Sequence, residues 1–448
     1  MNQFWAKILP GLIYEQIEKR PDLRRVATNT GWLFADRLVR IGIGLGVSGW
    51  LARYLGPEQF GLFNYAIAFA ALFSALATLS LDAIVVREIV RNPASQDEIL
   101  GTTVALRLIS GSVAFLVTVG SIFLLRPQES PARWLVVIMA ITMLFQSADT
   151  IDLWFQSQVQ SRYSVWVKNA AFVAMTLVRV GLILLQAPLT AFAWAYLAEM
   201  ALGAVGLVSA YHARGRSLRA WRVTFNRSRQ LLQESWPLML SGLAIIIYMK
   251  VDQVMLGTLV GDKATGIYAA AVRISEIWYF IPTAIAVSIA PALIAAREIG
   301  ERAYYQRLQE LFRLMIGVAL VITAPISLLS GWLVRLIFGD VYAASGAMLS
   351  VHIWATPFVF LGVTQGIWDV TEGLTRLALR RTVLGAVVNV LLNLILIPSL
   401  AGLGAAIATV AAYALSAYFA NLLHPQTRRM FFLQTRSLFF LASSSRST

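Results

Sequence analysis

Mostly apolar runs of about 20 residues recur along this chain and constrain its fold more than any other feature. A helix of that length can cross about 30 Å of hydrocarbon. Of the 448 residues, 58% are hydrophobic and 13% are charged, whereas soluble proteins carry about 25% charged residues. A transmembrane β-barrel would instead show short alternating segments. The sequence therefore predicts an all-α polytopic membrane protein.

The apolar runs predict about twelve transmembrane helices. They fall at residues 31–50, 60–85, 100–125, 132–155, 165–186, 189–211, 231–256, 267–292, 312–333, 344–372, 382–399 and 402–423. The longest connection lies in the middle and divides the chain into two halves. The predicted domains are a cytoplasmic or interfacial N-terminal segment (1–30), an N-lobe (31–212), a basic cytoplasmic linker (213–230), a C-lobe (231–424) and a cytoplasmic tail (425–448).

The net charge of +14 indicates how the chain is oriented. In a soluble protein such an excess would suggest nucleic acid, but here basic cytoplasmic loops beside anionic lipid explain it. Most Lys and Arg residues outside the spans fall on one side of the predicted topology, which includes the linker and both ends of the chain. The opposite, outer side is predicted to hold Arg53, Arg126, Arg133, Lys263 and Arg335. The sequence therefore predicts cytoplasmic N- and C-termini, membrane lipid as a partner, and no nucleic acid.

Two short similarities indicate an internal repeat. In the loop and helix start at residues 56–66, Gly56, Gly61 and Phe63 match Gly261, Gly266 and Tyr268 at a constant offset. Asp149 and Asp152 similarly match Asp369 and Glu372. Both matches relate spans six apart, so the halves share one topology. This predicts parallel repeats, two six-helix lobes around a central cavity, as in transporters that rock one half against the other.

Some spans carry charged side chains. A charge near the middle of a bilayer costs about 3 kcal/mol or more, and it usually faces protein or water along a transport path. The first span holds Asp36, Arg37 and Arg40. The sequence therefore predicts that this helix lines a wet, cationic cavity. The basic residues predicted inside spans are Arg37, Arg40, Arg107, Arg179, Lys250 and Arg273.

Three segments carry a resemblance to a known family: ARYLGPEQFGLFNYAIAFAALFSALATLSLDAIVVREIVR (52–91), YAAAVRISEIWYFIPTAIAVSIAPAL (268–293) and NVLLNLILIPSLAGLGAAIAT (389–409). With these segments, the chain resembles bacterial polysaccharide repeat-unit flippases, of the O-antigen type. These belong to the multidrug/oligosaccharidyl-lipid/polysaccharide (MOP) exporter superfamily. The similarity covers roughly residues 30–425.

The resemblance implies a fold, a substrate and a place in the cell. It implies a flippase of the bacterial inner membrane that moves undecaprenyl-diphosphate-linked oligosaccharide from the cytoplasmic to the outer leaflet by alternating access. It also implies that coupling to H⁺ or Na⁺ is plausible. A polysaccharide polymerase or chain-length protein is a candidate partner. The alternative within the superfamily is an ion-coupled exporter of drugs or other small molecules.

The six intramembrane cations would bind the diphosphate, since the planar fork of arginine matches phosphate oxygens. The alternative is structural pairing, because Asp36 and Arg40, and likewise Arg273 and Glu276, could meet on one helix face. Even without those pairs, Arg37, Arg107, Arg179 and Lys250 exceed the acids near them in sequence. Snorkelling of long side chains to the membrane surface is a further alternative.

Acidic and polar residues in the spans give two more groups of candidates. Asp252, Glu276 and Asp36 are candidates for ion coupling, because a buried carboxyl can exchange a proton or hold Na⁺, although salt-bridge roles are equally open. The candidates for sugar contact are Gln146, Asp149, Gln365, Trp368 and Asp369. Interhelical hydrogen bonding with interfacial tryptophan anchoring is the favoured alternative for the sugar-contact group.

The sequence offers no catalytic residues. His212, His352 and His424 are scattered, and HExxH, Walker and GxSxG motifs are absent. There are no cysteines for thiolate metal sites. The sequence predicts a protein that is not an enzyme and has no metal and no bound cofactor; a membrane glycosyltransferase or ligase is the alternative of a different class.

Overall fold

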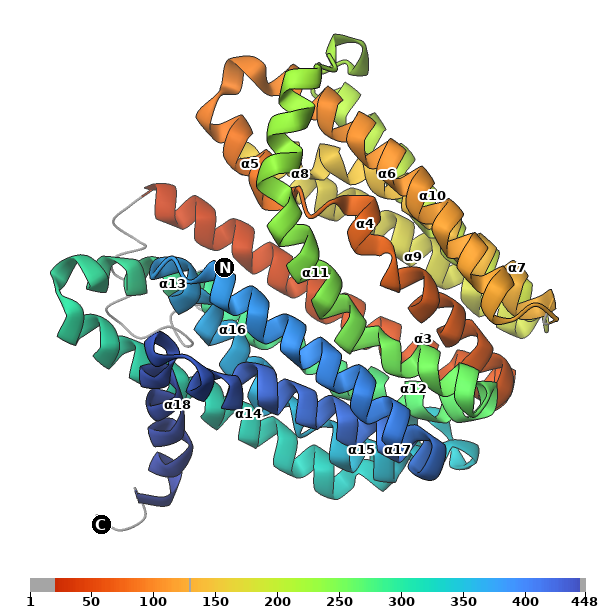
Figure 1. The fold of residues 1–448 in the computed structure, drawn as a ribbon. Helices are drawn as coiled ribbons and strands as arrows, with labels where there is room; N and C mark the ends of the chain where they lie inside the picture. Colours follow the sequence, from red (N-terminus) through yellow and green to blue (C-terminus); the bar gives the residue numbers. More distant parts are fainter. Residues whose placement is uncertain (1–20, 129, 444–448) are drawn as a thin grey trace. The chain divides into compact units, whose positions relative to one another are not determined.

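The structure is a computed structural model that describes residues 21–128 and 130–443. Side chains are described in residues 40–128, 130–290 and 292–438. Every regular element in the described ranges is an α-helix or a short 3-10 turn, so the predicted all-α fold is confirmed (Figure 1).

The helices follow the predicted spans closely. In the first half they are α3 (Pro21–Leu72), α4 (Ser74–Thr78), α5 (Asp82–Arg91), α6 (Gln96–Leu125), α7 (Ser130–Phe145), α8 (Asp149–Ser157), α9 (Arg162–Leu184) and α10 (Leu189–Ala213). In the second half they are α11 (Phe225–Leu259), α12 (Asp262–Glu276), α13 (Phe280–Ile299), α14 (Glu301–Phe338), α15 (Ser345–His352), α16 (Ala355–Thr371), α17 (Thr375–Ala417) and α18 (Pro425–Ser443). The 3-10 turns η2 (Gln146–Ala148), η4 (Ile277–Tyr279) and η6 (Phe419–Leu423) join consecutive helices.

Among the described residues, nine helical segments are long and apolar enough to cross a membrane, or ten if a bent pair counts as one more span. Two long helices each contain a residue with non-helical backbone angles, Gly56 in α3 (φ 72°, ψ 169°) and Ala401 in α17 (φ 48°, ψ −129°). The chain reverses direction at both places (Figure 1). Each long helix thus contributes to two predicted spans, and the helices are consistent with about twelve.

The chain divides into two compact units that differ from the predicted lobes. Unit 1 contains the described chain up to Gly44, together with Leu76–Leu116 and Ala140–Trp236. Unit 2 contains Leu45–Ala75, Val117–Met139 and the chain from Pro237 onward. The boundaries predicted for the N-lobe, linker and C-lobe stay predictions.

Each unit has its own apolar core. In unit 1, Trp154 and Phe155 of α8 pack with Tyr211 of α10 and with the buried face of α5. Ring centroids of Trp154 and Tyr211 lie 5.1 Å apart, and the Trp154 indole donates to Gln96 Oε1 at 3.0 Å. In unit 2, one core cluster joins α13, α14 and α16 to α18, and another joins α11 and α12 to α17. Both units therefore bury side chains away from lipid, as a bundle of membrane helices requires.

The matched repeat segments pack directly on each other inside unit 2. Gly56 and Gly261 both adopt a positive φ, 72° and 121°, which glycine tolerates without a steric penalty. The helical segments that follow Gly56 and Gly261 cross each other where Gly61 faces Gly266. A Cβ on Gly61 would lie 2.6 Å from Gly266 N and would overlap Asp262 O, while a Cβ on Gly266 would lie 2.9 Å from Gly61 N and would overlap Pro57 O. The contact is thus reciprocal between repeat-related residues, as expected of parallel repeats.

The last described helix was not predicted. Residues 425–448 were assigned only as a cytoplasmic tail, whereas α18 is a 19-residue helix packed against α14. Gln309 of α14 donates to Leu433 O at 3.1 Å and also to the Ser437 hydroxyl. Figure 1 shows α18 running across the end of the neighbouring unit 2 helices rather than alongside them.

Candidate functional site

Arg40 is the described basic residue of the predicted cationic first span. It lies in α3 and is half-buried. Its Nε donates to Asn169 Oδ1 at 2.9 Å, and its guanidinium carbon lies 5.1 Å from the ring centroid of Phe172. Both partners come from α9. A neutral amide and a ring face of α9 thus contact this guanidinium.

Three of the other predicted lumen cations are ion-paired with a carboxylate of a neighbouring helix. Buried Arg107 of α6 pairs with Asp82 of α5 and also donates to Thr150 Oγ1 at 3.4 Å. Arg179 of α9 and Glu199 of α10 lie 2.5 Å apart, and Lys250 of α11 lies 2.9 Å from Glu276 of α12. These three cations exceed the acids near them in sequence, but the structure pairs each with an acid from a neighbouring helix. The inference of an excess of positive charge at these three positions is therefore wrong.

Of the remaining two predicted cations, the structure describes the side chain of Arg273 but not that of Arg37. Arg273 lies near the end of α12, and its side chain is exposed. The side chains of Arg37 and of Asp36 lie outside the described residues. Their assignments to the cationic lumen and to ion coupling stay predictions.

Asp252 occupies a fully enclosed polar site in unit 2. It lies in α11 with 1% of its surface exposed. Tyr268 of α12 donates to Oδ2, Thr409 of α17 donates to the same oxygen at 3.3 Å, and the backbone N–H of Gln253 donates to Oδ1 at 2.7 Å. Buried carboxylates need such partners, because an unpaired charge in the interior is costly. Three helices thus meet at one carboxyl group.

Further polar side chains of unit 2 come from the helices that meet at Asp252 and from α15. Glu276 of α12 pairs with Lys250 as described above, and the adjacent Ser275 hydroxyl lies 2.9 Å from His352 Nδ1 of α15. The ring of Tyr413 in α17 contacts Tyr248 edge to face, with centroids 4.9 Å apart. Asp252 and Glu276, the two described ion-coupling candidates, therefore lie on adjacent helices, α11 and α12, and have different partners.

In both halves, acids of the second repeat match pair with a basic residue of the following helix. In the first half, Lys168 of α9 lies 2.8 Å from both Asp149 and Asp152. In the second half, Arg381 of α17 pairs with Asp369 of α16. Each basic residue lies in the second turn of the helix that follows the acids. The repeat thus preserves an ion pair between consecutive helices.

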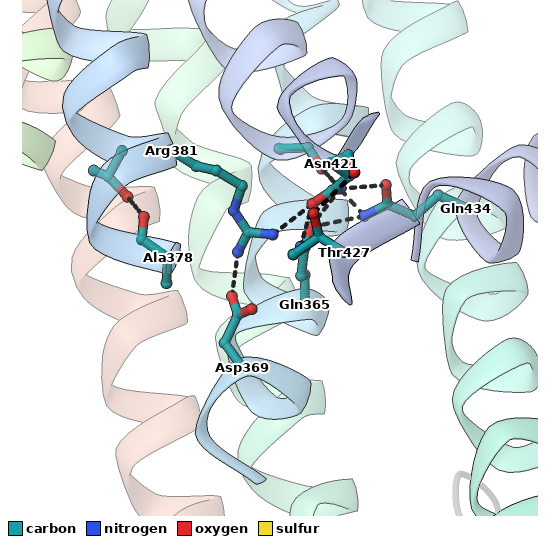
Figure 2. A network of polar contacts seen from close by, with 9 residues as sticks. Gln365, Asp369, Ala378, Arg381, Asn421, Thr427 and Gln434 are labelled. Atoms are coloured by element: carbon teal, nitrogen blue, oxygen red, sulfur yellow. Dashed lines mark hydrogen bonds and ion pairs between the residues drawn. The ribbon is translucent and has the colours of Figure 1, made fainter. Parts of the chain in front are cut away.

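Three of the sugar-contact candidates are buried in unit 2. Gln365 and Asp369 belong to the polar network of Figure 2, whereas the Trp368 indole donates to the Tyr305 hydroxyl at 3.4 Å. Gln365, Trp368 and Asp369 are 1%, 2% and 4% exposed. The side-chain amides of Gln365, Asn421 and Gln434 hydrogen-bond with one another at 2.6–3.0 Å, and Arg381 bridges Asn421 to Asp369. This arrangement corresponds to the alternative of interhelical hydrogen bonding; assignment of these residues to sugar contact stays a prediction.

The two sugar-contact candidates of the first half are less enclosed. Asp149 keeps 46% of its side chain exposed while it pairs with Lys168. Gln146, in the turn η2 just before α8, is half-buried. Gln146 begins this 3-10 turn and Asp149 follows it, and their role in sugar contact also stays a prediction.

Several residues of these sites were missed from sequence. Lys168 and Arg381 were not among the predicted site residues, although both lie inside helices and pair with candidate acids. Tyr268 was noticed only as the repeat match of Phe63. Nothing marked Tyr268 or Thr409 as a partner of Asp252, because a single hydroxyl in an apolar helix is common. Asn421 gave none because its partners are distant in sequence. The pairing of matched acids with the next helix is the signal that could have found Lys168 and Arg381.

Comparison with known proteins identifies the family. The family described as "Polysaccharide biosynthesis protein" matches residues 26–296, and the MatE family matches residues 237–395. Since the first match covers more than half of the chain, this protein belongs to the polysaccharide biosynthesis protein family. The predicted membership of the MOP superfamily is confirmed.

A curated relative and several solved structures are similar to the chain. A probable flippase, AglR of Haloferax volcanii, is 30% identical over 217 residues, a match that covers 46% of this chain and 44% of that protein. An inward-facing multidrug resistance MATE family transporter of the MOP superfamily superposes with a TM-score of 0.70 at 17% identity, over 88% of this chain and 95% of the other. The lipid II flippase MurJ superposes with a TM-score of 0.65 at 14% identity, over 94% and 93%. The two structures share the fold with this chain.

Proposed function

We propose that this protein is a flippase that moves a polyprenyl-diphosphate-linked oligosaccharide from the cytoplasmic to the outer leaflet of the inner membrane. The polysaccharide biosynthesis family match over residues 26–296 carries this proposal. The partial similarity to a probable flippase supports it, and so does the fold shared with a lipid II flippase. The saccharide head group would pass between the halves by alternating access while the polyprenyl tail stays in lipid.

Arg37, Arg40 and Arg273 are the residues we propose to contact the diphosphate. Arg40 and Arg273 have side chains at least partly accessible, in α3 and α12. Arginine stays charged in any environment and can donate two parallel hydrogen bonds to phosphate oxygens. Arg107, Arg179 and Lys250 contribute less in this proposal, because their side chains are only 1%, 15% and 24% exposed.

Neutralising the three arginines tests the proposal. In proteoliposomes, the triple variant Arg37→Gln/Arg40→Gln/Arg273→Gln should lower translocation of a lipid-linked oligosaccharide at least about 100-fold, because each charged hydrogen bond contributes about 1.5–3 kcal/mol. Translocation is measured by the access of an external reagent to the sugar. The control Arg53→Gln/Arg133→Gln/Arg335→Gln removes the same charge from residues predicted on the outer side and should keep normal transport. Unchanged translocation in the first variant would refute the diphosphate site.

Asp252 is the residue we propose to couple transport to an H⁺ or Na⁺ gradient. Its carboxyl group is buried where three helices meet, so a bound cation could change how these helices pack. Glu276 is a weaker candidate, because Lys250 already balances its charge.

The Asp252→Asn variant should lose coupling while it keeps its fold, because the amide has the same shape but no charge. Its oxygen can accept from the Gln253 N–H, and its NH2 group can donate to the hydroxyl oxygens of Tyr268 and Thr409. We expect gradient-driven accumulation to fall to the rate measured without a gradient, while exchange down a substrate gradient persists. The Asp340→Asn variant changes an acid that is 92% exposed and should behave as wild type. Full gradient dependence in Asp252→Asn would place coupling elsewhere.

A second candidate function is export of drugs or other small molecules. The MatE family match over residues 237–395 and the MATE transporter fold favour it. Deletion of the gene in its host separates the two functions. Loss of surface polysaccharide with unchanged drug susceptibility supports the flippase, whereas increased drug susceptibility with normal polysaccharide supports the exporter. A purified protein that transfers labelled sugar would instead indicate a glycosyltransferase or ligase.

A further inference from the structure

All charged side chains of α18 are positive. Its sequence, PQTRRMFFLQTRSLFFLAS, contains three arginines and no acid. The helix is amphipathic, but its inner face is anchored by polar as well as apolar side chains. The buried inner residues are Thr427, Met430, Gln434 and Ser437. All three arginines are exposed, with Phe432 on the same outer face and 57% exposed.

The contacts of the inner face fix the rotation of α18 about its axis. Gln434 joins the buried network that holds Asn421 and Gln365, and it also donates to Ala417 O at 3.1 Å (Figure 2). Thr427 donates to Asn421 O at 2.8 Å, and the Ser437 hydroxyl accepts from Gln309. Because these bonds are directional and enclosed, the helix cannot turn to bury its arginines.

The outer face keeps cationic groups without acidic partners. Arg429 pairs with Glu301 of α14 and stacks over the ring of Tyr305 at 3.4 Å. Arg428 and Arg436, in contrast, have no carboxylate partner in the part of the chain that the structure describes; Arg428 Nε donates to the carbonyl of Leu422 at 3.2 Å. Phe432 lies between them at helical spacing of four residues on each side. Two cations thus flank an exposed aromatic ring.

The end of unit 2 on which α18 lies carries more exposed arginines. Arg302 belongs to the first turn of α14, and Arg376 and Arg380 belong to the first two turns of α17. Both helix starts contact α18 or its network, through Glu301 and Arg381. Helix α18, which crosses this end of unit 2, is therefore part of a cationic surface. A helix that lies in the plane of a membrane interface has the same arrangement.

We propose that the outer face of α18, formed by Arg428, Phe432 and Arg436, binds anionic phospholipid headgroups of the cytoplasmic leaflet. The arginines pair with headgroup phosphates, and the phenyl ring enters the boundary between headgroups and acyl chains. An acidic protein would match the charge, but it would not require an apolar ring at the centre of the patch. This binding surface is separate from the proposed transport site and does not depend on which substrate is carried.

The absence of cysteine allows a direct test of where α18 lies. A nitroxide spin label on Phe432→Cys is placed in full-length protein reconstituted in phosphatidylcholine vesicles with or without phosphatidylglycerol. With phosphatidylglycerol, we expect membrane-soluble oxygen to relax the label more strongly than an aqueous nickel chelate does. A label that stays accessible to the chelate in both vesicles would overturn the proposal and indicate a face open to a protein partner.

The charge requirement has its own test. The Arg428→Gln/Arg436→Gln variant should lower the preference of the purified protein for phosphatidylglycerol over phosphatidylcholine, measured by native mass spectrometry. The expected loss is roughly fivefold per arginine, or about 25-fold in total. The control Arg133→Gln/Lys263→Gln removes the same charge from the predicted outer side. An equal loss in the control, or no loss in the variant, would refute specific binding by α18.

Discussion

The Arg381→Met variant should be severely destabilised. Arg381 and Asp369 keep only 10% and 5% of their side-chain surface exposed, and Arg381 also donates to Asn421. Removal of one member of a buried ion pair leaves an uncompensated charge and costs about 3–5 kcal/mol. The variant would leave Asp369 without its cation, and Asn421 would lose one of the two donors to its side-chain oxygen. We therefore expect a large fall in the melting temperature of the detergent-solubilised protein, with loosening of α18.

Two further variants show whether the pair itself is responsible. Arg381→Met/Asp369→Leu replaces both charges with apolar groups and should recover most of the lost stability, because no buried charge remains. Arg335→Met removes an exposed arginine that lies 3.8 Å from Asp340, and such a surface pair contributes at most about 1 kcal/mol. If Arg381→Met were no less stable than Arg335→Met, the network of Figure 2 would not support the packing of α18.

Hydropathy placed the membrane helices well because the bilayer itself sets their length and apolarity. The span predicted at 189–211 is the helix Leu189–Ala213, and that predicted at 165–186 is Arg162–Leu184. Helix α18 was not predicted, because hydropathy detects only the long apolar segments that a bilayer requires. It contains no long apolar run, and contacts with α14, α16 and η6 hold it in place.

The candidate site was harder to predict than the spans. Spacing along one helix shows which charges can meet on that helix, but the partners of Arg107, Arg179 and Lys250 come from the next helix. Likewise, no local pattern indicates that Tyr268 and Thr409 meet at Asp252, because that contact depends on how three helices pack. The repeat was visible in sequence, whereas the direct contact between its glycines required the structure.

That contact between repeats carries the second large expected effect. Gly61→Ala and Gly266→Ala should each destabilise the protein by about 1–3 kcal/mol or more, because the new methyl group overlaps backbone atoms of the facing helix start. Backbone atoms cannot rotate away as a flexible side chain does, so the two helices must separate. The melting temperature in detergent should fall for both single variants. Gly120→Ala is the matched control, since no atom lies within 4 Å of its added Cβ.

The reciprocal geometry makes a sharper prediction for the double variant. A Cβ on Gly61 meets Asp262 and Gly266, and a Cβ on Gly266 meets Pro57 and Gly61, so both substitutions push apart the same pair of helix starts. Once the first methyl group has separated them, the second meets less resistance. The double variant Gly61→Ala/Gly266→Ala should therefore lose clearly less stability than the sum of the single variants, because contacting sites are not additive. Strict additivity in a double-mutant cycle would show that the two glycines do not share one contact.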